Sequence, residues 1–433
     1  MMIFTPDALR NPYPAYQALR AAGPLHWCEE FCGGAWVVVN YDDVAEVLRD
    51  PHYSVQRAGG WVNSSGAGSA EELREFKRIF ARSLIFMNPP RHTRMRHGMN
   101  GGFKPAAIQA FAPRIVEIVD ALLDRIIEEG LDLHGPGGQH TFDFMREFAR
   151  PLPARVIAGM MAVETNAQTD FVGWSDDIAA FIGSPTPTLD IARRAQHGLL
   201  AMHAYFRELV PQRRARPGDD LVSQLIAAEA EGQIVTEKSL LAQCCTLLFA
   251  GHETTRNLLG NGLHALLSHP DQWGLLAREP ALMRSAVREL LRFDSSVQYT
   301  GRRLREDVVM HGQTMKKGDL VIALIGAANH DPSKFTAPER LDVTRNEGHH
   351  LSFGFGPHVC IGASLTYLEA EIALRRVMER LPQLECMPGE PAWSGNSVYR
   401  GLLELPVRFM LPGQGITASK ALATSEAGDG LVR

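Results

Sequence analysis

The sequence predicts a mainly α-helical chain with small β-sheets, on three observations. Amphipathic stretches, in which apolar residues recur every three or four positions, follow one another along the chain. One segment, residues 240–267, is apolar on most faces, as expected for a helix buried along its length. Extended segments are short and few, and the clearest is Trp36-Val-Val-Val-Asn.

The composition is typical of a soluble globular protein and argues against several other classes. Of 433 residues, 45% are hydrophobic and 21% charged, and the length alone would allow about three domains. The net charge of −5 argues against a nucleic-acid partner, which would favour a basic excess. Six cysteines without a C-x-x-C pair suggest neither a disulfide framework nor a zinc ribbon. No apolar leader and no membrane-length apolar run is present, so we expect a cytoplasmic protein without a membrane partner.

The first part of the chain predicts short elements. Residues 11–22 predict a helix ended by Gly23-Pro24, residues 36–40 a strand, and residues 41–49 a helix that stops before Pro51. Residues 59–69 are rich in Gly and Ser and have no period, which predicts a mobile loop. Helices are also expected over residues 108–129 and 142–161, the second broken at Pro151 and Pro153.

Longer elements follow. Two amphipathic stretches between residues 171 and 214 are separated by the proline-containing residues 183–188 and predict a helix–loop–helix. The helix over residues 240–267 would be about 42 Å long before Pro270 ends it. Residues 308–323 predict a hairpin and residues 405–409 a last strand. Residues 415–433 lose the apolar pattern and are expected to be disordered.

A basic helix begins after Pro89-Pro90. His92 and Arg96 are four positions apart and therefore share one helix face. Two adjacent donors suit a bound carboxylate, although a solvated basic face would have the same spacing.

The middle of the long apolar helix reads Ala250-Gly-His-Glu-Thr-Thr255. A glycine costs roughly 1 kcal/mol against alanine in a helix, and a buried Glu253 costs more unless it has a partner. Such local conflicts tend to mark functional sites. We expect the Thr254 hydroxyl to bond the Ala250 carbonyl and open a small groove. The alternative is a kinked helix with a solvated Glu253.

Cys360 lies in the stretch Phe353-Gly-Phe-Gly-Pro-His-Val-Cys-Ile-Gly362, directly before a segment of helix-forming composition. At a helix start, free backbone N–H groups and the helix dipole favour a thiolate over a neutral thiol. The glycines permit close approach to the backbone, so the loop suits a flat metal cofactor. A lone cysteine beside a turn is otherwise usually a buried structural residue.

This stretch fits the haem-binding signature F-G-x-G-x-H-x-C-x-G, and the chain therefore resembles the cytochrome P450 family. The resemblance extends from the Pro12-Tyr-Pro helix to the strand after Leu405. It implies one P450-type domain over residues 1–414, with haem b (iron protoporphyrin IX) between the long helix and the cysteine loop. It also implies that the Cys360 thiolate is the axial ligand of the iron.

The family pattern assigns further residues by position. Glu253 and Thr254 resemble the acid–alcohol pair that relays protons to dioxygen, beside Ala250 and Gly251 on the same side of the haem. Phe353 and Gly362 belong to the cysteine loop. Haem propionates would face His92, Arg96, Arg302 and His358, and Arg303 would point the other way on an extended chain. Glu289, Arg292 and Arg340 resemble the buried ion network behind the haem, although an acid and a base three apart can also form an exposed pair of little consequence.

The implied activity is insertion of one oxygen atom into a small, largely apolar molecule, by hydroxylation or epoxidation, in secondary-metabolite biosynthesis. The implied electron source is NAD(P)H, through a ferredoxin reductase and a ferredoxin that docks near Arg91, Arg94, Arg375 and Arg376. Alternatives with the same fold are a hydrogen-peroxide-driven peroxygenase and a non-catalytic haem-binding recruitment protein. Hydrolysis by Cys360 and His358 would require these two side chains to face each other.

Overall fold

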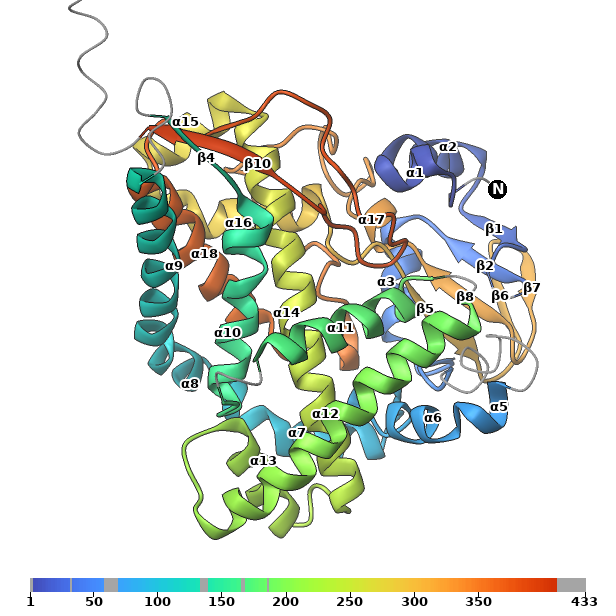
Figure 1. Cartoon of the computed structure of the whole chain (residues 1–433). Helices are drawn as coiled ribbons and strands as arrows, with labels where there is room; N and C mark the ends of the chain where they lie inside the picture. Colours follow the sequence, from blue (N-terminus) through green and yellow to red (C-terminus); the bar gives the residue numbers. More distant parts are fainter. Residues whose placement is uncertain are drawn as a thin grey trace, which may run out of the picture.

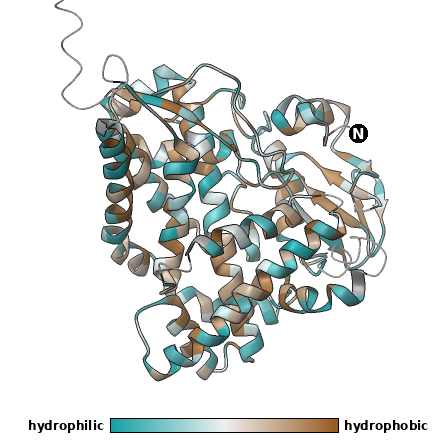
Figure 2. Cartoon of the chain, in the orientation of Figure 1, coloured by the Kyte–Doolittle hydropathy of each residue, from teal (hydrophilic) through white to brown (hydrophobic). Residues whose placement is uncertain are grey.

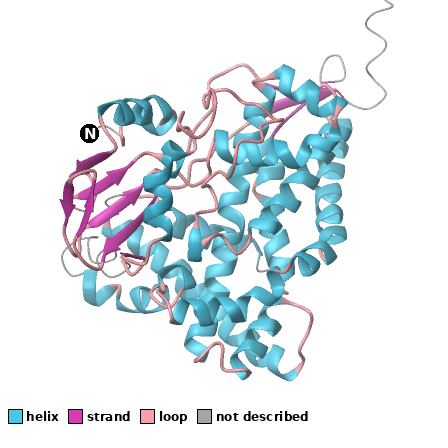
Figure 3. Ribbon diagram, turned by 180° about the vertical axis from the view of Figure 1, so that it is seen from behind, coloured by secondary structure: helices cyan, strands magenta, loops and turns pink. Residues whose placement is uncertain are grey.

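The computed structural model describes residues 3–31, 33–57, 69–132, 139–164, 168–184 and 187–410. Helices form most of this part of the chain, and a small sheet lies at one side with the N-terminal helices (Figures 1 and 3). The structure thus confirms the predicted fold class, mainly α with small β-sheets.

The helices are α1 (Pro6–Arg10), α2 (Tyr13–Ala22), α3 (Tyr41–Arg49), α5 (Ser69–Glu72), α6 (Arg74–Phe80), α7 (Arg91–Met99), α8 (Pro105–Ala110), α9 (Ala112–Asp132), α10 (Pro151–Met160), α11 (Gln168–Ile182), α12 (Leu189–Ala215), α13 (Leu221–Ala230), α14 (Glu237–Leu267), α15 (Pro270–Arg278), α16 (Met283–Phe293), α17 (Ile325–Ala328) and α18 (Ala363–Arg380). The strands are β1 (Leu25–Cys28), β2 (Ala35–Val38), β3 (Tyr53–Ser54), β4 (Gln139–Asp143), β5 (Thr300–Leu304), β6 (Val308–Met310), β7 (Gln313–Met315), β8 (Leu320–Ala323), β9 (Glu385–Cys386) and β10 (Pro406–Met410).

The largest sheet has the strand order β1-β2-β8-β5-β3, in which only β2 and β8 pair in parallel. Successive side chains of a strand point to opposite faces. Val37 of β2 accordingly packs in a cluster with Tyr16 of α2, whereas Val38 packs with Val44 of α3 on the other face. Both faces of the sheet are therefore buried, which explains its apolar strands in Figure 2.

Helix α14 passes through the middle of the molecule, behind α11 and α12 in Figure 1. The Thr236 side chain caps its start by accepting a hydrogen bond from the backbone N–H of Ser239. The helix has 31 residues and is about 46 Å long. Residues on all its faces are buried, including Gln243 and Asn257, because other helices pack around most of it. An apolar helix surrounded in this way holds its central residues in a fixed place.

Most predicted elements are found close to their expected bounds. The helices predicted at residues 11–22, 41–49 and 240–267 correspond to α2, α3 and α14, and the predicted helix–loop–helix corresponds to α11 and α12. The strand predicted at residues 405–409 is β10.

Two predictions were wrong in part. The segment 142–161 is not helical from its start, because Phe142 and Asp143 pair with β10 and a π-helical turn precedes α10 at Pro151. Residues 308–323 form more than a hairpin, since β8 leaves the β6–β7 pair and joins the large sheet. The loop predicted at residues 59–69 lies outside the described residues except for Ser69, and the tail predicted at 415–433 lies wholly outside them. Among the helices of the described chain, none combines the length and the apolar character needed to cross a membrane.

Candidate functional site

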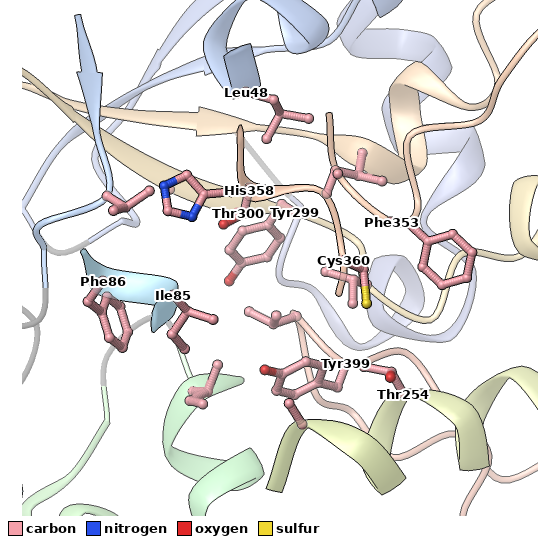
Figure 4. A pocket seen from close by; sticks show the side chains of 18 of the residues that line it. Leu48, Ile85, Phe86, Thr254, Tyr299, Thr300, Phe353, His358, Cys360 and Tyr399 are labelled. Carbon is pink, nitrogen blue, oxygen red and sulfur yellow. The ribbon is translucent and has the colours of Figure 1, made fainter. Parts of the chain in front are cut away.

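A cavity of about 390 Å³ lies between the centre of α14 and the loop before α18. Figure 4 shows Cys360 and Thr254 on opposite sides of this cavity, with Phe353 beside the cysteine. Aliphatic and aromatic side chains from α3, α14, the turn Leu84–Phe86 and the segment around Tyr399 complete much of the wall. The cavity thus brings together segments that are far apart in the sequence.

The cysteine loop is held by its backbone. The Cys360 N–H donates to the Phe353 carbonyl at 2.8 Å, and Gly354 and Gly356 have φ values of +73° and +75°. A Cβ on Gly356 would lie 2.8 Å from the Cα of Arg49 in α3, so a side chain there would push the loop and the helix apart. Glycine at this position is required both by the backbone angle and by the close packing.

The thiol of Cys360 experiences opposing effects. Burial raises its pKa, while the backbone N–H groups of Gly362 and Ala363 and the positive charge of Arg96 lower it. Gly362 is the N-cap of α18, so the stabilisation expected from a helix start is present. Gly362 does not itself line the cavity in the described chain, and it acts through this contact with the sulfur.

A group of basic side chains gathers at one end of the cavity. The rings of His92 and His358 lie 4.0 Å apart, and Arg96 and Arg302 also line this region. Burial lowers the pKa of His92 to about 4 and that of Arg302 to about 9. Within the described residues, neither ring nitrogen of the buried His92 has a hydrogen-bond partner. No carboxylate of the described residues forms an ion pair with any of the four, so the group is suited to bind an anion.

Arg302 and Arg303 separate as predicted for neighbours on a strand. Arg302 is 5% exposed and donates to the Thr300 hydroxyl and the Gly301 carbonyl. Arg303 donates to the Gly318 carbonyl near the surface.

Glu253 is linked to the protein surface by ion pairs. Its Oε1 accepts from Arg256 at 2.6 Å, and Arg256 also bonds Asp176 of α11 at 3.0 Å. Asp176 pairs in turn with Arg150, whose side chain is 46% exposed. Burial raises the pKa of Glu253 and Arg256 lowers it, with burial the larger effect. Oε2 of Glu253 has no hydrogen-bond partner among the residues that the structure describes, so the carboxyl can take up and release a proton beside the cavity.

The expected hydrogen bond from Thr254 to the Ala250 carbonyl is absent from the described chain, and α14 is continuous across this region. The Thr254 hydroxyl is directed toward the cavity instead (Figure 4). Ala250 lines the cavity, whereas Gly251 does not. A Cβ on Gly251 would meet Ile157 of α10 at 2.7 Å, so this glycine serves the packing of α10 against α14. His252 is buried, and burial lowers its pKa to about 3.

The buried ion network behind the cysteine loop has a different third member from the one predicted. Glu289 and Arg292 form two hydrogen bonds of 2.7 and 2.8 Å, and both are 2% exposed. Arg345, not Arg340, completes the network at 3.1 Å from Glu289. Arg340 is exposed and contributes only its carbonyl. The loop turns between these positions, and this turn brings the later arginine inward.

Other cavity residues carried no sequence signal. Arg57, Phe86, Thr300 and Tyr399 come from four separate segments and meet in the wall of the cavity. Only the tertiary fold places them together.

The model of the family "Cytochrome P450" matches residues 33–279 and 272–409. The chain is 37% identical to the cytochrome P450 monooxygenase PikC of Streptomyces venezuelae, over 93% of this chain and 92% of that protein. It is 33% identical to the polyketide biosynthesis cytochrome P450 PksS of Bacillus subtilis, over 92% of this chain and 95% of that protein.

Among solved structures, P450BioI in complex with an acyl carrier protein ligated to hexadec-9Z-enoic acid superimposes with a TM-score of 0.84 at 33% identity, covering 93% of this chain and 99% of that one. Both sequence and fold therefore match over nearly the whole length. The chain belongs to the cytochrome P450 family.

Proposed function

We propose that this P450 is a haem-thiolate monooxygenase that hydroxylates or epoxidises a small, largely apolar molecule in secondary metabolism, and that residues 1–414 act as one domain. The observation that carries the proposal is the placement of Cys360 and Thr254 on opposite sides of one largely apolar cavity (Figure 4). A thiolate on one side and a hydroxyl with an adjacent acid on the other suit activation of dioxygen above a haem.

The residues present fit a haem. The ring N–H of His92, together with Arg96, Arg302 and His358, offers donors for two propionates. The loop Phe353–Gly362 presents the Cys360 sulfur to the cavity, where it would hold the haem iron, and Phe353 and Ala250 would contact the bound haem. When bound, haem supplies the binding and reductive activation of dioxygen.

The chain's own residues control protons and water. The Thr254 hydroxyl can both donate and accept a hydrogen bond within the cavity. Glu253, with its free Oε2, can pass a proton toward Thr254, while the ion pairs of Arg256 with Glu253 and Asp176 hold its carboxyl in place. Much of the remaining cavity wall is apolar, so Glu253 and Thr254 are the groups on this side that can hold and move a proton.

Two partners complete the proposal. Electrons would come from NAD(P)H through a ferredoxin reductase and a ferredoxin. Arg91 and Arg94 support a docking surface at the start of α7, because both are exposed and neither pairs with an acid of the described residues. Arg376 is a weaker candidate, since it already pairs with Asp120 and Glu379. Arg375 donates to the Pro280 carbonyl.

The substrate class is supported by the apolar lining and by the relative whose name refers to polyketide biosynthesis. A titration of the haem-loaded protein with a library of secondary-metabolite intermediates, followed by the shift of the Soret band, tests binding. A carbon-monoxide difference spectrum tests the thiolate ligand.

Turnover separates the alternatives. The proposal expects product with ferredoxin, reductase and NAD(P)H. A higher rate with hydrogen peroxide would indicate a peroxygenase. No product from any ligand that shifts the Soret band would indicate a recruitment protein.

A further inference from the structure

Arg57 is a cationic side chain in the cavity wall that pairs with no acid of the described residues. It follows β3, and its Nη2 donates to the Thr300 hydroxyl at 3.4 Å. Its guanidinium carbon lies 5.2 Å from the centre of the Phe86 ring. The Arg57 side chain also packs closely against Gly301, since a Cβ added to Gly301 would lie only 3.4 Å from the Cδ and Nε of Arg57. These contacts fix the guanidinium at the cavity surface.

The charged side chains beside Arg57 in the described chain are all cationic. In the described part of the chain it forms no ion pair, and residues 58–68, which follow it, contain no Asp or Glu. Its charged neighbours Arg302 and Arg303 are also cations. Burial, with a smaller contribution from the charge of Arg303, lowers the pKa of Arg57 to about 10. An enclosed cation among cations is unfavourable until an anion arrives.

Under the proposed function, four other side chains are available to the two haem propionates. Arg96 and Arg302 already provide one arginine for each of the two propionates, and His92 and His358 add further donors. Arg57 then remains as an additional positive charge. Arg57 lies at the edge of this group, because its charge acts on Arg302 and His358. It also interacts with Phe86 and with Tyr399, which lies next to Thr254 in Figure 4.

Two hydroxyls beside Arg57 can donate to the same anion. The Thr300 oxygen accepts from Arg57 and from Arg302, so its own hydrogen is free to donate. The Tyr399 hydroxyl lines the cavity, and burial raises its pKa, so it remains a protonated donor. A guanidinium flanked by two hydroxyls is a good receptor for a planar carboxylate.

We propose that Arg57, with Thr300 and Tyr399, binds a carboxylate of the substrate, and that the substrate is therefore a free organic acid with an extended apolar body. The inference rests on the proposed function, because it uses the same cavity. It makes Arg57 a specificity-determining residue, which favours the free acid over a neutral ester or a carrier-bound thioester.

The test uses the haem-loaded full chain and a matched probe series: straight-chain acids of 10 to 16 carbons, their methyl esters and their primary alcohols. Dissociation constants are taken from Soret titrations at pH 7.5. The wild type is expected to bind at least one acid about tenfold more tightly than its ester and alcohol.

Arg57→Gln should lose this preference for the acid, because acid binding should weaken about tenfold while ester binding changes less than about threefold. Arg57→Lys should keep part of the preference, because it keeps the charge. Arg305→Gln, which removes an exposed arginine outside the cavity lining, is the matched control and should leave the preference unchanged.

Haem content and the carbon-monoxide difference spectrum are measured first for every variant. A wild type without the thiolate spectrum would contradict the proposed function itself. A normal wild type that shows no acid preference anywhere in the series would overturn the role of Arg57 alone. Loss of haem from both Arg57→Gln and Arg57→Lys would show that Arg57 binds a propionate and would overturn its role in substrate binding. Tighter binding of a carrier-protein-linked acyl chain, equal in wild type and Arg57 variants, would overturn that role as well.

Discussion

Nε of Arg345 lies 3.1 Å from Oε1 of Glu289, in a network where Arg292 occupies both oxygens of the same carboxylate. The arginine that matches the family motif, Arg340, is at the surface. Glu289 and Arg292 belong to α16, and Arg345 also donates to the Thr336 carbonyl. The network therefore links α16 to the loop that contains Thr336 and Arg345. This relationship yields the first of five predictions.

Arg345→Met should destabilise the protein by about 3–5 kcal/mol, because it removes one partner of a buried charge. Arg340→Met should change stability by less than about 0.5 kcal/mol, as expected at an exposed position. The measurement is the urea midpoint of each holoprotein, followed by the Soret band. Similar losses in the two variants would contradict the assignment of Arg345.

Glu369→Gln should stabilise the protein at neutral and alkaline pH. Glu369 of α18 is 1% exposed, its Oε1 has no partner, and burial raises its pKa to about 8 from the usual 4.5. Folding raises the pKa of this carboxyl, so the folded protein holds a proton that the unfolded chain has already lost between about pH 4.5 and pH 8. The stability of the wild type therefore falls as the pH rises through this range. The variant should therefore exceed the wild type by roughly 3 kcal/mol at pH 7 and by little near pH 5.

Urea midpoints at several pH values test this dependence. Glu379→Gln, at an exposed position of the same helix, is the control and should show no such pH dependence. A constant difference between Glu369→Gln and wild type from pH 5 to 8 would show that the carboxyl is not protonated in the folded state.

Thr254→Val should lower the yield of oxidised product per electron consumed by about 10–100-fold, because the hydroxyl that positions the proton in the cavity is lost. The substrate-induced Soret shift should change less than about threefold. Thr254→Ser, which keeps the hydroxyl, should restore most of the yield. Equal yields from the Val and Ser variants would remove the hydroxyl from the mechanism.

His92→Phe should lose haem at least about tenfold faster than the wild type, since one charge-assisted hydrogen bond contributes about 1.5–3 kcal/mol. Transfer of haem to apomyoglobin measures the rate. His97→Gln changes an exposed residue of the same helix and should leave the rate unchanged. An unchanged rate in His92→Phe would exclude His92 as a propionate partner.

The double variant Arg91→Glu/Arg94→Glu should slow reduction by ferredoxin about tenfold or more at low salt, and less at high salt, because opposite charges steer association. Stopped-flow reduction of the carbon-monoxide complex gives the rate, and reduction by dithionite serves as the control. Rates that match the wild type at every salt concentration would place the ferredoxin elsewhere.

Local patterns predicted much of this protein. The sequence predicted the buried helix α14, the helix–loop–helix of α11 and α12, and the glycine-rich loop before α18. These features could be predicted because periodicity, helix ends and turn chemistry depend on residues only a few positions apart. The pairing of Phe142 with β10 was not readable, because that strand partner lies more than 260 residues away.

The same division holds at the site. The sequence by itself determined which segment carries the thiol, which helix carries the acid and the alcohol, and that Glu289 and Arg292 share a helix face. Only the tertiary structure decided that Arg345 completes that pair, that the Thr254 hydroxyl points into the cavity, and that Arg57 meets Thr300 and Tyr399. The spacing of residues in the sequence determines which side chains are neighbours along a helix or a strand. Contacts between distant segments depend instead on how the whole folded chain buries apolar surface and pairs its buried charges.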